Sequence, residues 1–192
     1  RSGSTAARVG AELRTSWKAE LGGRLTQPVV ADGKVFVARI DAGQICVLDA
    51  ASGEPVWDYI AGGRIDSPPT YHKGLLLFGS RDGWVHCVRA SDGALSWRFR
   101  DLPDAMICAF DQLESAWPVH GSVLIKNDTA YFCAGRTSYL DGGIFIYCLD
   151  PVNGRLLKSR SVYGPFMEKT GFPFAVQSTG TKGTSVGPSG GK

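Results

Sequence analysis

The segment Val47–Trp57 (VLDAASGEPVW) decides the fold, because it returns 40 residues later as Cys87–Trp97 (CVRASDGALSW). Trp17 stands a further 40 residues upstream of Trp57, so three tryptophans mark one period. About 40 residues is the length of a four-stranded β-propeller blade. The sequence therefore predicts a repeat protein made of blades.

The flanking residues keep the same period. Leu21–Pro28 (LGGRLTQP) matches Ala61–Pro68 (AGGRIDSP), and a weaker third copy, Cys148–Lys158 (CLDPVNGRLLK), has lysine at the tryptophan position. From Gly93 to Gly154 is 61 residues, so the third repeat carries about 21 extra, 10 before Pro118 and 11 after it. We therefore expect one repeat to be elaborated.

Within a repeat, alternating apolar residues between turn residues indicate four strands. In the first repeat these are Val29–Ala31, Lys34–Ala38, Ile45–Asp49 and Pro55–Ile60. A single sheet cannot bury both of its faces, so we expect the blades to stack face to face. The residues expected to dock one blade on the next are Trp17, Trp57, Trp97, Gly53, Gly93 and Gly154.

The fold class expected is all-β: a partial β-propeller of about three four-stranded antiparallel blades, with an incomplete ring because closure takes about four to eight blades. The expected segments are an N-terminal extension (1–14), an outer-strand end (15–21), blades at 22–61 and 62–101, an expanded blade (102–161), the start of a further blade or an extension (162–176), and a tail (177–192). The Gly, Ser and Thr content of this tail predicts flexibility.

Composition excludes several classes of function. Apolar residues make up 43% of the 192, enough for a folded core. Lys and Arg number 21 against 18 Asp and Glu, scattered along the chain, so neither nucleic-acid binding nor membrane-surface binding is indicated. No apolar run is long enough for a membrane-spanning helix. The five cysteines form no CxxC pair and fit small buried apolar residues.

The candidate site lies at one end of the blades. The connection between the second and third strands and the connection to the next blade emerge at this end, which we name the loop face, and both insertions fall there. Binding loops concentrate where a rigid scaffold presents them. The candidate ligand-binding residues are Arg24, Arg39, Arg64, Asp66, Arg81, Glu114, Trp117, His120, Arg136, Tyr139 and Asp141.

Two interpretations of this set stay open. Converging arginines suit a carboxylate, a phosphate or a sulfated sugar, with Trp117 and Tyr139 as a stacking wall. Alternatively, the arginines pair with the acidic residues across blades, and the two aromatic residues only pack. His120 has no Ser or Cys partner at a recognisable spacing, so we expect a structural histidine and assign no catalytic residue.

Val47–Trp57 resembles the tryptophan-docking motif of quinoprotein dehydrogenases, Ala-x-Asp-x-x-x-Gly-x-x-x-Trp, through Asp49, Gly53 and Trp57. The resemblance covers about Thr15 to Ser161, and this repeat also occurs in outer-membrane assembly lipoproteins, which bind protein and have no cofactor. It implies a pyrroloquinoline-quinone-type propeller outside the cytoplasm, and segments 112–122 and 134–143 are similar to large bacterial extracytoplasmic propeller proteins. The motif marks the fold and leaves the function open.

We therefore expect a non-catalytic scaffold that presents the loop face to a protein or to a polar, anionic or sugar ligand, without a cofactor or a metal. The alternative is a fragment of a pyrroloquinoline-quinone-dependent alcohol or sugar dehydrogenase. By resemblance, that enzyme needs a calcium ion and usually two adjacent cysteines; Glu114 and Asp141 are available ligands, but no Cys-Cys pair occurs. A third possibility is self-association, or completion of the ring by further blades, through the open blade faces.

Overall fold

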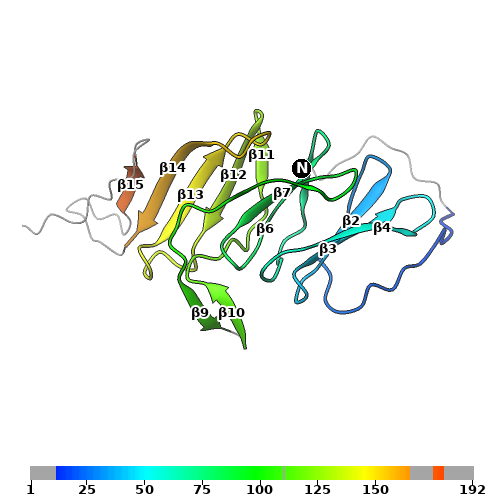
Figure 1. Cartoon of the computed structure of the whole chain (residues 1–192), viewed down its shortest axis with the longest axis horizontal. Coiled ribbons are helices and arrows are strands. Elements are labelled where there is room, and N and C mark those ends of the chain that lie inside the picture. The colour runs from blue at the N-terminus through cyan, green and yellow to red at the C-terminus, as the bar shows by residue number, and fades with distance from the viewer. Residues whose placement is uncertain (1–11, 110, 165–174, 180–192) are drawn as a thin grey trace, which may run out of the picture.

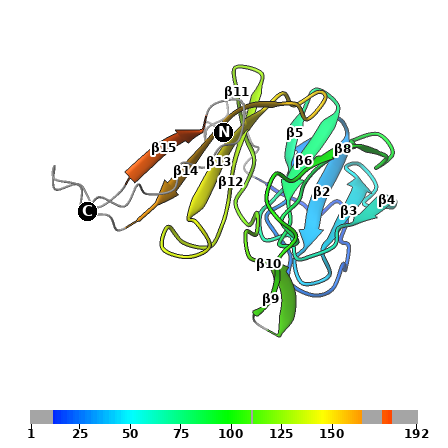
Figure 2. The ribbon, with the colours of Figure 1, turned by 60° about the vertical axis from the view of Figure 1, so that its left-hand side comes forward.

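The computed structural model describes residues 12–109 and 111–164 and the backbone of 175–179. In these residues the chain forms fifteen strands and no helix. The strands form three large antiparallel sheets that follow one another along the molecule, and a small hairpin projects from them (Figure 1). Figure 2 shows the same sheets from a second direction.

The first two sheets have the same design. The first consists of β1 (Val29–Ala31), β2 (Lys34–Arg39), β3 (Gln44–Asp49) and β4 (Pro55–Ile60). The second consists of β5 (Thr70–His72), β6 (Leu75–Gly79), β7 (Val85–Arg89) and β8 (Leu95–Phe99). In both, the strands pair in chain order, as expected of blades. The strands predicted for the first repeat are confirmed to within one residue.

The third repeat contains the insertions. Its sheet consists of β11 (Leu124–Lys126), β12 (Thr129–Ala134), β13 (Ile144–Leu149), β14 (Leu156–Tyr163) and β15 (Ala175–Thr179). One insertion forms the hairpin of β9 (Met106–Ala109) and β10 (Gln112–Ser115). Another lengthens the connection between β12 and β13, which runs over 135–143, whereas its counterparts run over 40–43 and 80–84.

β15 corrects one detail of the sequence interpretation. The sequence predicts a flexible tail from Gln177 onward, but the backbone of Gln177 to Thr179 pairs with β14 opposite Ser161 to Ser159. Backbone groups can pair without any apolar side chain. The amino-acid composition of this segment therefore does not predict the strand. Residues 180–192 and most of the segment 162–176 lie outside the described residues.

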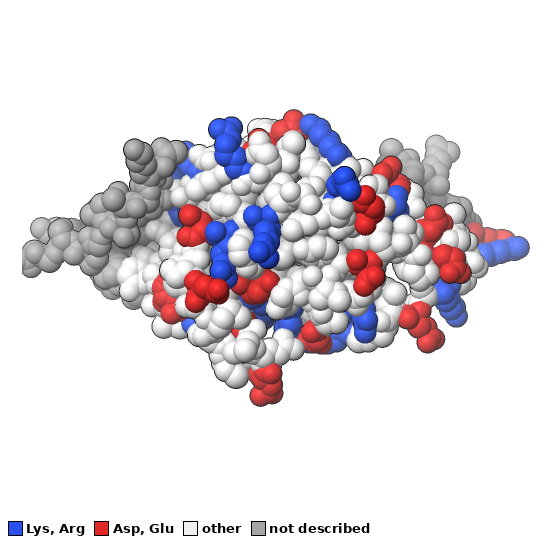
Figure 3. Space-filling model, viewed as in Figure 1, with Lys and Arg blue, Asp and Glu red and all other residues white. Residues whose placement is uncertain are grey.

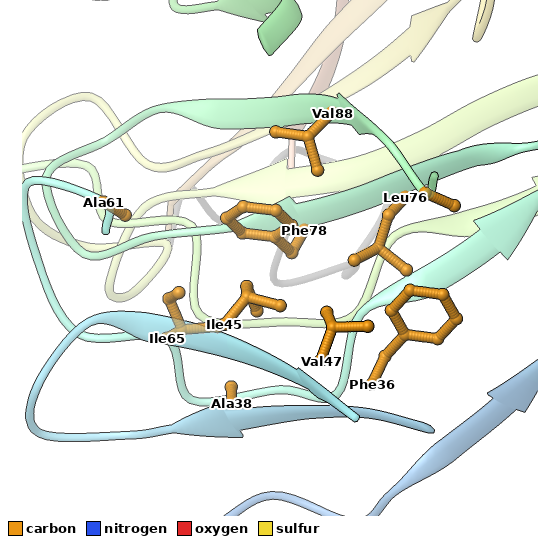
Figure 4. Packing of buried hydrophobic residues seen from close by; sticks show 10 residues of the cluster. Phe36, Ala38, Ile45, Val47, Ala61, Ile65, Leu76, Phe78 and Val88 are labelled. Carbon is orange, nitrogen blue, oxygen red and sulfur yellow. The ribbon is translucent and has the colours of Figure 1, made fainter. Parts of the chain in front are cut away.

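Side chains of neighbouring sheets interdigitate to form the core. Between the first and second sheets, Phe36, Ile45 and Val47 pack with Leu76 and Phe78, all of them buried (Figure 4). A second cluster joins the second and third sheets through residues such as Leu77, Val85, Phe132, Tyr147 and Leu149. Because alternate residues of β6 and β7 enter different clusters, the second sheet is buried on both faces.

The three predicted tryptophans occupy equivalent places at successive seams. The indole Nε1 of Trp17 donates a hydrogen bond to the carbonyl oxygen of Ala50 at 3.0 Å. Trp57 donates to Ala90 at 3.3 Å, and Trp97 donates to Pro151 at 3.0 Å. Each indole therefore reaches the turn between the third and fourth strands of the following sheet.

That turn needs glycine for two reasons. Gly93 has φ +74°, a conformation that L side chains rarely adopt, and a Cβ on it would lie 2.6 Å from the Trp57 ring. In the first sheet, Asp49 Oδ1 fixes the turn by accepting hydrogen bonds from the backbone N–H groups of Ala51 and Ser52. Gly53 and Gly154 meet Trp17 and Trp97 in the same way, so each indole lies against a turn glycine of the following sheet. The described chain is thus an all-β partial propeller.

Candidate functional site: the loop face

A row of alternating charges crosses the loop face. Arg24 binds Asp41 through two hydrogen bonds, Nε to Oδ2 at 2.9 Å and Nη2 to Oδ1 at 2.8 Å. Arg64 then lies between two carboxylates, with Nε 3.3 Å from Asp41 Oδ1 and Nη2 3.4 Å from Asp66 Oδ1. This part of the row spans the first and second repeats.

Arg81 continues the row into the third repeat. Its Nε donates to Asp66 Oδ2 at 2.5 Å, and its Nη1 donates to Glu114 Oε2 at 2.7 Å. Glu114 belongs to β10, so this bond ties the inserted hairpin to the second sheet. We name the six residues the charge ladder: Arg24, Asp41, Arg64, Asp66, Arg81 and Glu114.

The two ends of the ladder differ in burial. The side chain of Arg24 is 64% exposed and that of Asp41 is 45% exposed, whereas that of Glu114 is only 4% exposed. Ion pairs at the exposed end contribute little to stability, because water screens them. At the buried end, each charge depends on its partner, because an unpaired buried charge is costly.

Hydrogen bonding favours the charged forms of Arg24, Asp41 and Arg81. The bond from Arg24 lowers the pKa of Asp41, and the same bond raises the pKa of Arg24. Burial opposes the charge on Arg81, but its bonds to Asp66 and Glu114 outweigh this, and the pKa of Arg81 is raised. Arginines therefore pair with acidic residues across blades at Arg64 with Asp41 and at Arg81 with Glu114, whereas Arg24 and Asp41 pair within one repeat.

A separate group of polar contacts holds the lengthened connection 135–143 in place. Arg136 Nη2 forms an ion pair with Asp141, and Arg136 Nε donates to the carbonyl oxygen of Ala116 at 3.3 Å. The indole Nε1 of Trp117 donates to the carbonyl oxygen of Asp141 at 2.6 Å. Trp117 thus packs against the loop, and its N–H group is already used.

The other predicted site residues do not join these clusters. Arg39 Nη1 donates to Gln44 Oε1 at 2.8 Å within its own sheet. The side chain of His120 is exposed, and its carbonyl oxygen accepts a bond from Ser67 Oγ at 2.6 Å. Tyr139 is 53% exposed near the tip of 135–143. The structure therefore does not bring the whole set together at one point.

Sequence reasoning missed the apolar part of this face. On the hairpin, Met106 is 45% exposed and Leu113 is 69% exposed, and Leu140 on the neighbouring loop is 52% exposed. The alternation of apolar residues on both sides of Asp111 could have predicted a hairpin. The other repeats lack this insertion, so its strands could not be aligned with theirs. Elsewhere on the surface in Figure 3, acidic and basic groups are interleaved.

The described residues do not fit a calcium site. Glu114 is bound by Arg81 and Asp141 by Arg136, so each carboxylate already has a cationic partner. Within the described ranges, no three His, Cys, Asp or Glu side chains gather as a metal site requires. No helix in the same ranges is long and apolar enough to cross a membrane.

Comparison with known proteins identifies the family. The profile described as outer membrane protein assembly factor BamB matches residues 1–181. The chain belongs to this family. BamB of Xanthomonas campestris is 32% identical over an alignment of 93 residues that covers 43% of this chain and 22% of that protein. The chain thus spans about a fifth of the length of this relative.

Two further proteins are similar to parts of this chain. The DNA damage-responsive serine/threonine-protein kinase RqkA of Deinococcus radiodurans is 33% identical over 89 residues, 45% of this chain and 13% of the kinase. Among solved structures, a europium-containing methanol dehydrogenase matches with a TM-score of 0.61 at 15% identity, covering 79% of this chain and 27% of that chain. An identity of 15% shows that the dehydrogenase and this BamB family chain share a fold. It does not assign the reaction of the dehydrogenase to this chain.

Proposed function

We propose that this chain is a non-catalytic propeller scaffold that binds a protein partner through its loop face, outside the cytoplasm. Membership of the family described as outer membrane protein assembly factor BamB supports both the protein partner and the compartment. A kinase is similar to part of this chain in sequence and a dehydrogenase shares its fold, so family membership alone does not assign the role.

The chemistry of the loop face carries the proposal. Arg24, Arg64 and Arg81 are bound by carboxylates of the chain itself, so a small anion would have to displace an existing ion pair. By contrast, Met106 and Leu113 expose apolar side chains beside the ladder. Exposed apolar groups beside polar residues are typical of protein interfaces. A protein therefore fits this face better than a small anionic or sugar ligand.

Site-specific photo-cross-linking in the native host tests the proposal. We would introduce p-benzoylphenylalanine at Leu113 and, separately, at Tyr139. Matched control positions are Lys73 and Asn127, which lie in short turns at the opposite end of the sheets. The proposal predicts the same protein adduct from Leu113 and Tyr139 and none from the controls. Adducts of equal yield from both ends of the sheets would contradict it.

The alternative function, a fragment of a quinone-dependent dehydrogenase, stays a prediction that no described residue favours. Addition of pyrroloquinoline quinone and calcium tests it. A bound quinone absorbs visible light, and an active enzyme would reduce a dye with an alcohol or a sugar as substrate. Quinone absorbance that stays with the protein after gel filtration, together with dye reduction, would replace the scaffold proposal.

A further inference from the structure

The hairpin of β9 and β10 has an unpaired edge. In Figures 1 and 2 it projects from the row of sheets, and β9 pairs with β10 and with no other described strand. The hairpin is an insertion that the first two repeats lack. Its position beside the charge ladder makes it part of the loop face, so a binding role for its edge rests on the proposed function.

The register of the hairpin shows which backbone groups point outward. Ser115 lies opposite Met106, and Ser115 N–H donates to Arg81 O at 2.8 Å, away from β9. In an antiparallel pair, facing residues direct their backbone groups either both inward or both outward, with a period of two. Met106 and Cys108 therefore direct their N–H and C=O groups to the outer edge of β9.

This edge lacks the usual protection. Proteins guard exposed strand edges with charged residues, proline or a covering element. The strand Met106–Ala109 (MICA) contains neither charge nor proline. Ser115, the corresponding position on β10, is already bonded to the Arg81 backbone, so β9 offers the more open edge.

One side of the hairpin is apolar and its tip is acidic. Cys108 lies directly opposite Leu113 and two residues from Met106, so these three exposed side chains share a face. Asp111 at the turn is exposed, and no ion pair with another described residue involves it. In Figure 3 the hairpin is a white surface that ends in an acidic group.

We propose that the outer edge of β9 binds an extended segment of the partner protein as an added strand. The outward N–H and C=O groups of Met106 and Cys108 can form hydrogen bonds with the backbone of an extended segment that lies alongside β9. The apolar face selects a segment with apolar side chains at alternate positions. The carboxylate of Asp111 selects a lysine or arginine at the end of that segment that reaches the hairpin tip.

A labelled peptide tests this inference on the full chain. The probe is fluorescein-Lys-Val-Thr-Val-Thr-Val-amide, and its binding is followed by fluorescence anisotropy. Cys108→Pro removes the outward N–H group without touching a bond between β9 and β10, whereas Cys108→Val retains it. We expect Cys108→Pro to weaken binding at least tenfold and Cys108→Val to change it less than threefold. Asp111→Asn should weaken binding about threefold to tenfold and reduce its dependence on salt.

Hydrogen exchange separates strand addition from other binding modes. The amides of Met106 and Cys108 should become protected when the peptide is bound, a readout that does not require the proline variant to fold. Absence of peptide binding by the wild-type chain, or equal binding by a folded Cys108→Pro variant, overturns the inference. A dimer in sedimentation that Cys108→Pro abolishes also overturns it, because a second copy then occupies the edge.

The outcome also separates this inference from the proposed function. Photo-cross-links at Leu113 that persist in the Cys108→Pro variant would leave the loop face as a protein-binding surface and remove strand addition alone. Equal cross-linking yields from Leu113 and from the control position Lys73, without the proline substitution, would instead contradict the proposed function itself.

Discussion

Arg81 and Glu114 form an ion pair of 2.7 Å between the second repeat and the hairpin inserted in the third. Glu114 is almost fully buried, and the same arginine also holds Asp66. The pair therefore joins the blade scaffold to the element that we propose as the binding surface. The stability of the scaffold and the position of the hairpin should depend on it together.

Arg81→Met should be strongly destabilising, because it leaves the buried carboxylate of Glu114 without its cation. Removing one partner of a buried pair costs about 3 to 5 kcal/mol, and we expect the lower end of that range in urea unfolding. The double variant Arg81→Met/Glu114→Met should recover most of the loss. Arg24→Met, at the exposed end of the ladder, should change stability much less. Equal losses for Arg24→Met and Arg81→Met would contradict the burial gradient.

Gly93→Ala should separate backbone strain from indole docking. A Cβ at Gly93 meets the Trp57 ring at 2.6 Å, whereas a Cβ at Gly33, which has a similar positive φ, meets no atom within 4 Å. Gly33→Ala should cost about 1 kcal/mol from strain alone. Gly93→Ala should cost about 2 to 4 kcal/mol in the same unfolding measurement, because the indole must also move. Similar costs for the two variants would argue against docking.

Sequence predicted the part of the fold that repeats. The spacing of Trp17, Trp57 and Trp97 located the junctions between neighbouring sheets. The alternation of apolar residues located the strands of the first sheet. Both patterns recur along the chain. It also placed the arginines on the loop face and left ligand binding and ion pairing as alternatives. The pairing of Arg81 with Glu114 could not be predicted, because Glu114 lies in an insertion whose hairpin register has no counterpart elsewhere in the chain.

His86 gives the scaffold a dependence on pH. It lies on β7 between the first and second sheets, where its Nδ1 is 3.0 Å from the Tyr59 hydroxyl and its Nε2 is 3.9 Å from Asp82 Oδ2. Burial lowers the pKa of His86 below 6.5, Asp82 opposes this change, and Arg98 adds to it. The unfolded chain therefore binds a proton at a higher pH than the folded chain does.

The free energy of unfolding should accordingly fall as the pH drops below about 6.5 and should level off below the folded-state pKa of His86. Each pKa unit of lowering removes about 1.4 kcal/mol. Denaturant unfolding between pH 7.5 and 4.5 measures the slope, and His86→Gln should flatten it. His120→Gln is the matched control, because that side chain is exposed. An unchanged slope in His86→Gln would show that other groups cause the dependence.

The cysteines should differ in reactivity. Burial raises the pKa of Cys87 to about 12, so it carries almost no thiolate at neutral pH, whereas Cys108 is exposed on β9. Iodoacetamide followed by peptide mass mapping should label Cys108 at least tenfold faster than Cys87 in the folded chain. Equal rates in the folded chain would contradict the burial of Cys87.

Hydrogen–deuterium exchange of the complex with the natural partner shows which end of the sheets the partner binds. If the partner binds the loop face, amides in 106–115 and 135–143 should gain protection, while the turns at 73–74 and 127–128 at the opposite end should not change. Protection confined to those opposite turns, with none in 106–115, would contradict the account.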